Sequence, residues 1–223
     1  MTAITSIPVV ILISGSGSNL QAIIDAANAG DCPIHISAVI SNRPDVKGLE
    51  RARLAGIKTD VIDHTKFDGR DAFDQALVNR IDSYQPTLVV LAGFMRILTN
   101  YFVEHYTGRL LNIHPALLPD FPGLNTHERA IKSGVKQHGA SVHFVTTEVD
   151  GGPIVLQASV PVKPDDTATA LAARVLQQEH LIYPLAIKWY AEGRLVLESN
   201  KPLFDKKELP VTGLDYAEVE NKP

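Results

Sequence analysis

The sequence predicts an α/β protein with a doubly wound, mostly parallel sheet and helices on both of its faces. Short, wholly apolar runs such as residues 9–13 and 88–92 alternate with amphipathic segments. Strands that are apolar on both faces and separated by helices are typical of a parallel sheet covered on both sides. The chain has 223 residues, of which 45% are hydrophobic and 21% charged, and this length suffices for one sizeable core.

The first half of the chain repeats the order strand, turn, helix. Strands are expected at residues 9–13, 34–40, 58–62, 88–92 and 109–114, with helices around 20–27, 48–55, 70–84 and 102–106. The helix at 70–84 shows the clearest periodicity, because one face carries Phe73, Ala76, Leu77, Ile81 and Tyr84. Such an apolar stripe is expected to pack against the sheet.

The pattern changes after His114, where three prolines and a glycine within nine positions predict a loop. A helix is expected at 126–133. Residues 140–145 and 153–162 alternate with period two across the turn at 148–152, which predicts strands added in a different style. A long helix at 167–190 and a short strand at 195–198 follow, and the polar tail from residue 200 onward is expected to be peripheral.

The composition limits the possible partners and the compartment. Lys and Arg number 21 against 25 Asp and Glu, and the net charge of −4 argues against a nucleic-acid-binding protein. Cys32 is the single cysteine, which excludes an intrachain disulfide and fits a reducing compartment. His127, His138 and His143 lack the spacing of a helical zinc site. No apolar run reaches the roughly 20 residues that cross a bilayer, so we expect a cytoplasmic protein without membrane partners.

A glycine-rich turn follows the first predicted strand. Gly15 and Gly17 allow a sharp turn at positive φ, and the helix that follows presents free N–H groups to an anion. Ser18 and Asn19 add side-chain donors or cap the helix. A dinucleotide fingerprint needs a third glycine where this chain has Leu20, and the P-loop lysine is also missing. The turn therefore predicts either a phosphate site or a plain strand-to-helix connection.

Three polar residues form a candidate catalytic constellation. Asn112 and His114 are two positions apart at the end of a predicted strand, so their side chains share one face. Ligands of open α/β sheets bind at this end of the strands, and Asp150 lies in a loop that can reach it. Acyl transfer needs a donor for the oxyanion and a group that handles a proton. The alternative is that Asn112 caps a loop, His114 is a satisfied core histidine and Asp150 turns a hairpin.

Five motifs of the chain are distinctive: ISGSGSNLQAI at 13–23, LAGFMRIL at 91–98, LLNIHPALLP at 110–119, GASVHFV at 139–145 and DGGP at 150–153. In these motifs the chain resembles the phosphoribosylglycinamide formyltransferases, the folate-dependent glycinamide ribonucleotide transformylases. The motifs occur in order, and the resemblance covers most of residues 8–198. The resemblance implies a Rossmann-like formyltransferase domain at 1–200, with a nucleotide-binding N-terminal half and a folate-binding C-terminal half. Residues 201–223 are left as a peripheral C-terminal tail.

The same resemblance implies an activity and a set of site residues. A formyl group would pass from 10-formyltetrahydrofolate, a co-substrate, to the amine of glycinamide ribonucleotide in purine biosynthesis, without a metal or a covalent intermediate. Asn112, His114 and Asp150 would be the catalytic residues. The ribonucleotide phosphate would bind Gly17, Ser18 and Asn19, and Glu179 would contact the nucleotide. The folate-binding positions would be Arg70, Met95, Arg96, Ile97, Leu98, Asn112, Thr146, Thr147, Glu148, Val149 and Asp150.

Two departures from the family pattern concern loop residues only. Ala116 stands where serine is common, and Asn125 stands where histidine is familiar. The nearest alternative function is a formyltetrahydrofolate hydrolase, with water as the acceptor. An enzyme acting on initiator tRNA would carry a further nucleic-acid-binding domain. A nucleotide-binding oxidoreductase and a non-catalytic module share the predicted fold, but the missing third glycine and the intact polar constellation disfavour them.

Overall fold

The computed structural model describes residues 6–220 and contains one large sheet. Within these residues the strand order is β11-β7-β6-β5-β4-β1-β2-β3. Neighbouring strands run parallel except for β5–β6 and β6–β7, which are antiparallel. The strands are β1 (Ile7–Ile13), β2 (Ile34–Ser41), β3 (Thr59–Val61), β4 (Leu88–Leu91), β5 (Leu110–His114), β6 (Gln137–Phe144), β7 (Ile154–Pro161) and β11 (Leu214–Asp215). The predicted doubly wound, mostly parallel sheet is confirmed.

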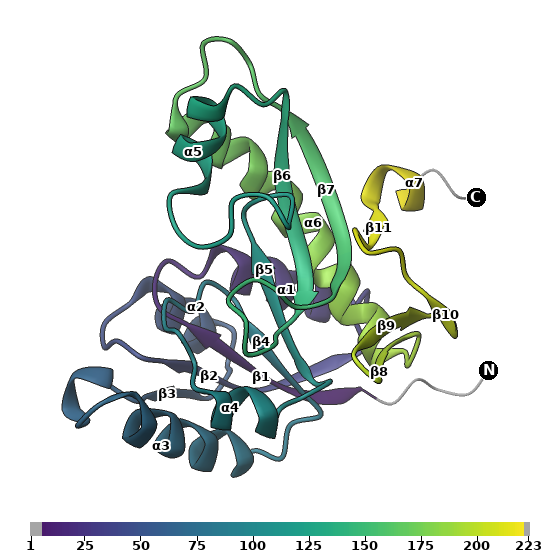
Figure 1. The fold of residues 1–223 in the computed structure, drawn as a ribbon. Coiled ribbons are helices and arrows are strands. Elements are labelled where there is room, and N and C mark those ends of the chain that lie inside the picture. Colours follow the sequence, from purple (N-terminus) through teal and green to yellow (C-terminus); the bar gives the residue numbers. More distant parts are fainter. Residues whose placement is uncertain (1–5, 221–223) are drawn as a thin grey trace.

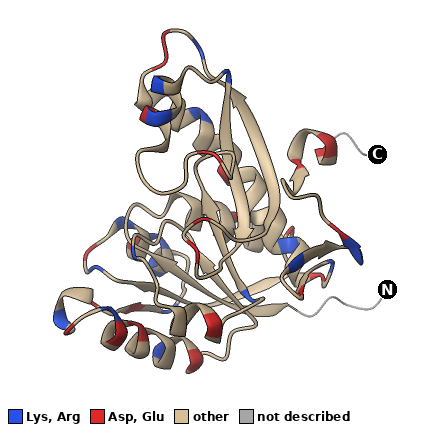
Figure 2. Ribbon diagram, in the orientation of Figure 1, with Lys and Arg blue, Asp and Glu red and all other residues tan. Residues whose placement is uncertain are grey.

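Helices cover both faces of this sheet (Figure 1). They are α1 (Ser18–Asn28), α2 (Lys47–Leu54), α3 (Arg70–Asp82), α4 (Asn100–His105), α5 (Thr126–Ser133), α6 (Ala168–Ala191) and the short α7 (Tyr216–Glu220). Acidic and basic residues are intermixed along these elements (Figure 2). None of the helices in residues 6–220 is long and apolar enough to cross a membrane.

The central strand β1 is buried on both faces, which explains why its sequence is apolar at every position. Val9, Ile11 and Ile13 pack into a core shared with α1 and α6, whereas Val10 and Leu12 pack into a second core under α3 and α4. All five side chains are fully buried. Because successive side chains of a strand point to opposite faces, a strand covered on both faces must be apolar at every position.

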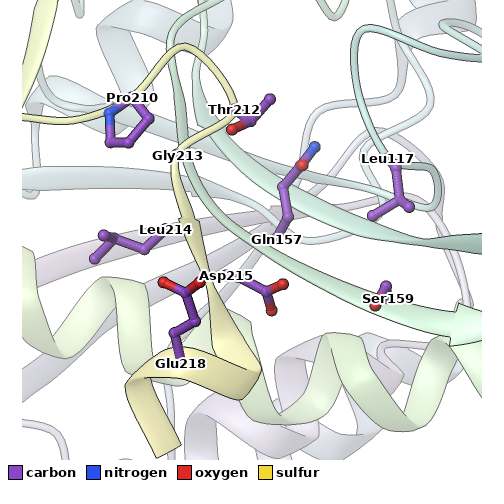
Figure 3. A pocket seen from close by; sticks show the side chains of 9 residues that line it. All are labelled: Leu117, Gln157, Ser159, Pro210, Thr212, Gly213, Leu214, Asp215 and Glu218. Atoms are coloured by element: carbon purple, nitrogen blue, oxygen red, sulfur yellow. The ribbon is translucent and has the colours of Figure 1, made fainter. Parts of the chain in front are cut away.

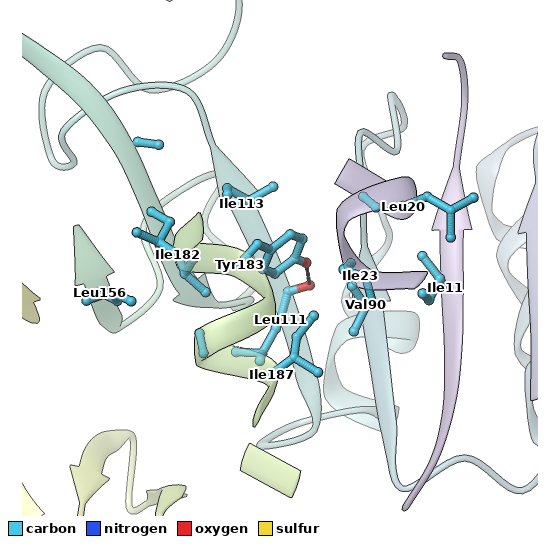
Figure 4. Packing of buried hydrophobic residues seen from close by; sticks show 14 of the residues in the cluster. Ile11, Leu20, Ile23, Val90, Leu111, Ile113, Leu156, Ile182, Tyr183 and Ile187 are labelled. Atoms are coloured by element: carbon cyan, nitrogen blue, oxygen red, sulfur yellow. Dashed lines mark hydrogen bonds between the residues drawn. The ribbon is translucent and has the colours of Figure 1, made fainter. Parts of the chain in front are cut away.

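The long helix α6 is anchored to the middle of the sheet by Tyr183. Its hydroxyl lies 3.0 Å from the carbonyl oxygens of Leu91 in β4 and Leu111 in β5. Figure 4 shows the contact with Leu111. Burial raises the pKa of Tyr183 well above its usual value, so the hydroxyl stays a donor. The helix thereby supports the two strands whose carboxyl ends carry the candidate site.

A crevice is expected where β1 and β4 lie side by side, since the chain order of the strands reverses there. Ser14, directly after β1, holds this region together. Its hydroxyl donates to Oδ1 of Asn42 at 2.6 Å and accepts from the backbone N–H of Met95 at 2.7 Å. The segments that follow β1, β2 and β4 are therefore linked at the carboxyl edge of the sheet.

Up to residue 220, the segment after α6 contains the predicted strand at 195–198 and three further strands that the sequence pattern does not reveal. A small second sheet consists of β8 (Leu195–Glu198), β9 (Lys201–Phe204) and β10 (Lys207–Glu208). Further along, β11 adds a parallel strand to the outer edge of β7. Two residues of the predicted tail, Leu214 and Asp215, thus belong to the main sheet. Residues 1–5 and 221–223 lie outside the described residues.

Candidate active site

Asn112 and His114 lie at the carboxyl end of β5 on one face of the sheet. Leu111 and Ile113, which alternate with them, point into the opposite core. The period of two that the sequence analysis used therefore holds at this strand end. His114 is almost fully buried, at 5% exposure, so other protein groups surround its ring.

Asp150 reaches His114 from the loop between β6 and β7. Its backbone is in the left-handed region, with φ at 53°, and Gly152 passes so close to the carbonyl oxygen of Phe144 that a side chain there would overlap it. The carboxylate oxygen Oδ2 accepts from the backbone N–H of Gly123 at 2.8 Å and lies 3.3 Å from Nδ1 of His114. The loop thus brings the predicted carboxylate to the predicted histidine.

The contacts of His114 fit a charged imidazolium ring. Nε2 lies 2.9 Å from the carbonyl oxygen of Phe121, and because a carbonyl only accepts, Nε2 must carry a hydrogen. Nδ1 faces the carboxylate of Asp150, which is favourable only when Nδ1 carries a hydrogen as well. A cationic donor beside the amide of Asn112 is an arrangement that can stabilise an oxyanion.

His143 is a further polar residue of this site that sequence reasoning missed. It is the register partner of Asn112 on β6, and its Nε2 lies 3.0 Å from Nδ2 of Asn112 and 3.8 Å from Oδ1 of Asp150. Burial lowers the pKa of His143. Spacing along the chain could not reveal this contact, because it depends on the pairing of two strands far apart in sequence.

The glycine turn and α6 meet at a second cluster. Gly17 adopts φ 70°, and α1 begins directly after it, so no side chain caps the backbone N–H groups of its first turn. A Cβ on Gly17 would lie 2.6 Å from the Cα of Gly48. Asn19 donates to the buried carboxylate of Glu179 at 2.6 Å, and burial raises the pKa of Glu179. The structure thus joins two residues that were predicted separately.

The remaining predicted residues surround the ends of α3 and β4. Met95 and Ile97 are exposed, at 63% and 61%, so they offer apolar surface to a ligand. The buried carboxylate of Asp74 accepts from the N–H of Thr99, and burial raises its pKa. The positive charges of Arg96 and Arg70 act on this carboxylate in the opposite direction.

Leu98 and the loop residues complete this region. Leu98 packs against the core under α3 and α4. Thr146, Thr147, Glu148 and Val149 lie in the loop that ends at Asp150, and Val149 is 53% exposed. Exposed apolar side chains with cations nearby are suited to a flat heterocycle that carries carboxylates.

Comparison with known proteins identifies the family. Residues 7–187 match the Formyl transferase family model. The chain belongs to the formyl transferase family. It is 55% identical to phosphoribosylglycinamide formyltransferase of Escherichia coli over 92% of this chain and 97% of that protein. The solved phosphoribosylglycinamide formyltransferase of Coxiella burnetii is 50% identical, with a TM-score of 0.91 over 95% of this chain and 99% of that one.

A more distant relative of known structure is named for a different activity, deformylation. The formyltetrahydrofolate deformylase of Pseudomonas putida is 26% identical, with a TM-score of 0.80 over 92% of this chain and 72% of that one. The matches to the family model and to the two phosphoribosylglycinamide formyltransferases confirm the resemblance found in the sequence motifs. They favour the transferase side of the family, because the identity to the transferases is about twice as high.

This formyl transferase also has a surface pocket that is separate from the candidate catalytic residues. It measures about 380 Å³ and lies between β7 and the C-terminal segment (Figure 3). Its lining consists of Leu117, Gln157, Ser159, Pro210, Thr212, Gly213, Leu214, Asp215 and Glu218. None of the predicted site residues lines it. In residues 6–220 no group of three or more His, Cys, Asp or Glu side chains is arranged to hold a metal ion.

Proposed function

We propose that this formyl transferase moves the formyl group of 10-formyltetrahydrofolate to the amine of glycinamide ribonucleotide, a step of purine biosynthesis. The observation that carries the proposal is the pairing of His114 with Asp150 beside Asn112 at the carboxyl end of β5. Its support comes from relatives named for this reaction that match over nearly the full length of both chains. The partners are two small molecules.

The reaction needs a neutral amine and a charged His114 at the same time. The amine nitrogen attacks the formyl carbon, and the carbonyl oxygen becomes an oxyanion. The Nε2–H of His114, which donates to the carbonyl oxygen of Phe121 in this structure, and the amide of Asn112 would be the donors to this oxyanion. The intermediate then expels the folate nitrogen, which takes up a proton while the new amide loses one. No bond forms between substrate and protein.

Binding of the ribonucleotide is assigned to the turn before α1 and to α6. The phosphate would accept hydrogen bonds from the first turn of α1 at Gly17, Ser18 and Asn19, where the helix dipole is positive. Glu179 would accept hydrogen bonds from ribose hydroxyls or the glycyl amide. Its position beside Asn19 supports a single continuous nucleotide site.

Binding of the folate is assigned to the segment after β4 and to the loop before Asp150. Met95 and Ile97 offer apolar surface to the pterin, and the backbone from Met95 to Leu98 offers groups for its edge. Arg70, at the start of α3, is a cation for a glutamate carboxylate of the donor. The residues Thr146, Thr147, Glu148 and Val149 would cover the ring.

One assay tests the proposal and separates it from the hydrolase alternative. Purified protein is mixed with 10-formyltetrahydrofolate, with and without glycinamide ribonucleotide, and the deformylated folate is followed. Transfer requires the ribonucleotide, whereas a hydrolase releases folate in its absence. Equal rates in both samples would favour the hydrolase, the activity named for the relative at 26% identity.

A cytoplasmic location is part of the same proposal. Cys32 is buried, and burial raises the pKa of its thiol to about 12, so it is kept in the unreactive thiol form. A single inert thiol is compatible with a reducing compartment. The helices of the described residues add no membrane-spanning segment.

A further inference from the structure

Three polar groups surround the ring of His143, and together they determine its protonation. The ring is 2% exposed. Nδ1 lies 2.9 Å from the carbonyl oxygen of Phe144, Nε2 lies 3.0 Å from Nδ2 of Asn112, and Oδ1 of Asp150 is 3.8 Å from the same Nε2. His143 therefore touches two of the three residues assigned to the reaction.

The donor and acceptor roles follow from what each partner can do. A backbone carbonyl only accepts, so Nδ1 of His143 carries the hydrogen. The amide nitrogen of Asn112 only donates, so Nε2 must present its lone pair. This is the neutral Nδ1–H tautomer. Burial lowers the pKa of His143, and this effect favours the same neutral form.

The tautomer of His143 determines which end of the Asn112 amide faces the reacting oxygen. An amide group has an oxygen that accepts and a nitrogen with two N–H bonds. One N–H of Asn112 donates to His143, which fixes the nitrogen on the side of His143 and leaves the other N–H to donate elsewhere. If Nε2 of His143 carried a hydrogen, the amide would turn over and present its oxygen to an oxyanion, which would be repulsive.

We propose that His143 is a positioning residue that holds the amide of Asn112 with its nitrogen toward the formyl oxygen. The proposal rests on the proposed function for the role of Asn112, but the hydrogen bond itself does not. The titratable groups that face the His143 ring are Asp150 and His114. His143 does not contact the substrate in this account and acts through Asn112.

The test compares His143→Gln with His143→Leu. A glutamine can place its carbonyl oxygen near the position of Nε2 and accept from Asn112, whereas leucine leaves the amide without this partner. We expect His143→Leu to lower kcat about 10²-fold, as the loss of one oxyanion donor does, with KM values for both substrates within about threefold. His143→Gln should recover most of that loss.

A double-mutant cycle with Asn112→Ala separates positioning from a direct role. Because His143 acts through Asn112, the change His143→Leu should have little further effect in the Asn112→Ala background. Single-turnover rates keep the slow variants measurable. His138→Gln is the matched control, since His138 lies on the same strand, is fully buried and bonds to His127 instead, and its kcat should stay within about threefold of wild type.

A ¹⁵N NMR measurement of the His143 ring keeps the two proposals distinguishable. At pH 7 we expect Nδ1 to be protonated and Nε2 to be unprotonated, and this readout needs no turnover and no variant. A protonated Nε2 would overturn the inference, as would wild-type kcat in folded His143→Leu or an undiminished loss in the Asn112→Ala background. Absence of formyl transfer in wild type with the expected ring state would refute the function alone.

Discussion

The carboxylate of Glu179 lies 2.6 Å from the side-chain amide of Asn19, although 160 residues separate the two in sequence. Both side chains are buried, and the second amide atom of Asn19, Oδ1, has no hydrogen-bond partner among the described residues. An unpartnered buried acceptor next to a helix start is expected where a ligand donor belongs. This contact joins α1 and α6 into one candidate nucleotide site.

Substitution of Glu179 should weaken ribonucleotide binding specifically. Glu179→Ala leaves the Nδ2 group of Asn19 without its acceptor and removes the carboxylate from the nucleotide, so we expect the KM for the ribonucleotide to rise at least tenfold. A hydrogen bond to a charged group contributes about 1.5 to 3 kcal/mol. Steady-state kinetics with each substrate varied in turn measure this, and Glu179→Gln is the milder control. A loss confined to the folate would refute the assignment.

Substitution of Gly17 tests the phosphate turn. Gly17→Val places a branched side chain at φ 70°, and its Cβ would lie 2.6 Å from the Cα of Gly48, so the turn must move. We expect a strong rise in the ribonucleotide KM with folate affinity nearly unchanged. Gly15→Ala controls for folding, since its Cβ would meet nothing within 4 Å and its Tm should match wild type. Unchanged ribonucleotide affinity in folded Gly17→Val would contradict the phosphate assignment.

Substitution of Arg70 should have a modest effect on the donor. Arg70 is exposed at the start of α3, and an exposed ion pair contributes about 0.2 to 1 kcal/mol. Arg70→Ala should therefore weaken binding of the folate roughly 1.4- to 5-fold. Isothermal titration calorimetry with each substrate measures it. If the loss falls on the ribonucleotide, Arg70 belongs to the other site.

Acid should destabilise the fold partly through His138. Burial lowers the pKa of His138 from 6.5 to about 4, so between these values the unfolded chain binds a proton that the folded one does not. Stability is then fully present above pH 6.5 and decreases as the pH falls toward 4. At 1.36 kcal/mol per pKa unit this amounts to roughly 2 to 3 kcal/mol at pH 4.5. Urea unfolding at pH 7.5 and 4.5 should show a smaller difference for His138→Gln, and an equal difference would contradict this.

Helices and strands with a clear hydrophobic period could be predicted, because this period is visible within each short segment of sequence. The predicted helix at 126–133 matches α5 in full, and the predicted strand at 195–198 matches β8. The edge strand β11 could not be predicted, since two residues carry no period and exist as a strand only through pairing with β7. The pairing of β11 with β7 forms only when the sheet assembles, so the local sequence does not reveal it.

The candidate site could be predicted only as far as it depends on strand ends and motifs. Asn112 and His114 share a face because they are two residues apart, and Asp150 was placed in a loop that could reach them. The contact with His143 depends on the register between β5 and β6, which no spacing in the sequence encodes. The contact between Asn19 and Glu179 depends in the same way on how α6 crosses the sheet.

The central claim is that charged His114, held by Asp150, acts as a donor during formyl transfer. Asp150→Asn removes the negative charge that faces Nδ1 of His114, so a charged ring loses its counter-charge. Activity should fall at both extremes of pH, because the amine must be neutral while His114 stays charged. Because the substrate amine and His114 act in the same step, neither limb of the pH–activity profile is assigned to one of them.

The measurement that tests this claim most directly is the pH dependence of kcat for wild type and Asp150→Asn between pH 5.5 and about 9.5. The account predicts a large drop in kcat at pH 7.5 and a profile that narrows or moves to lower pH on its alkaline side. His114→Ala and Asn112→Ala should each lower kcat about 10²-fold or more. Near wild-type turnover in Asp150→Asn, or an unchanged profile with only KM altered, would contradict the account and leave Asp150 as a residue of the turn.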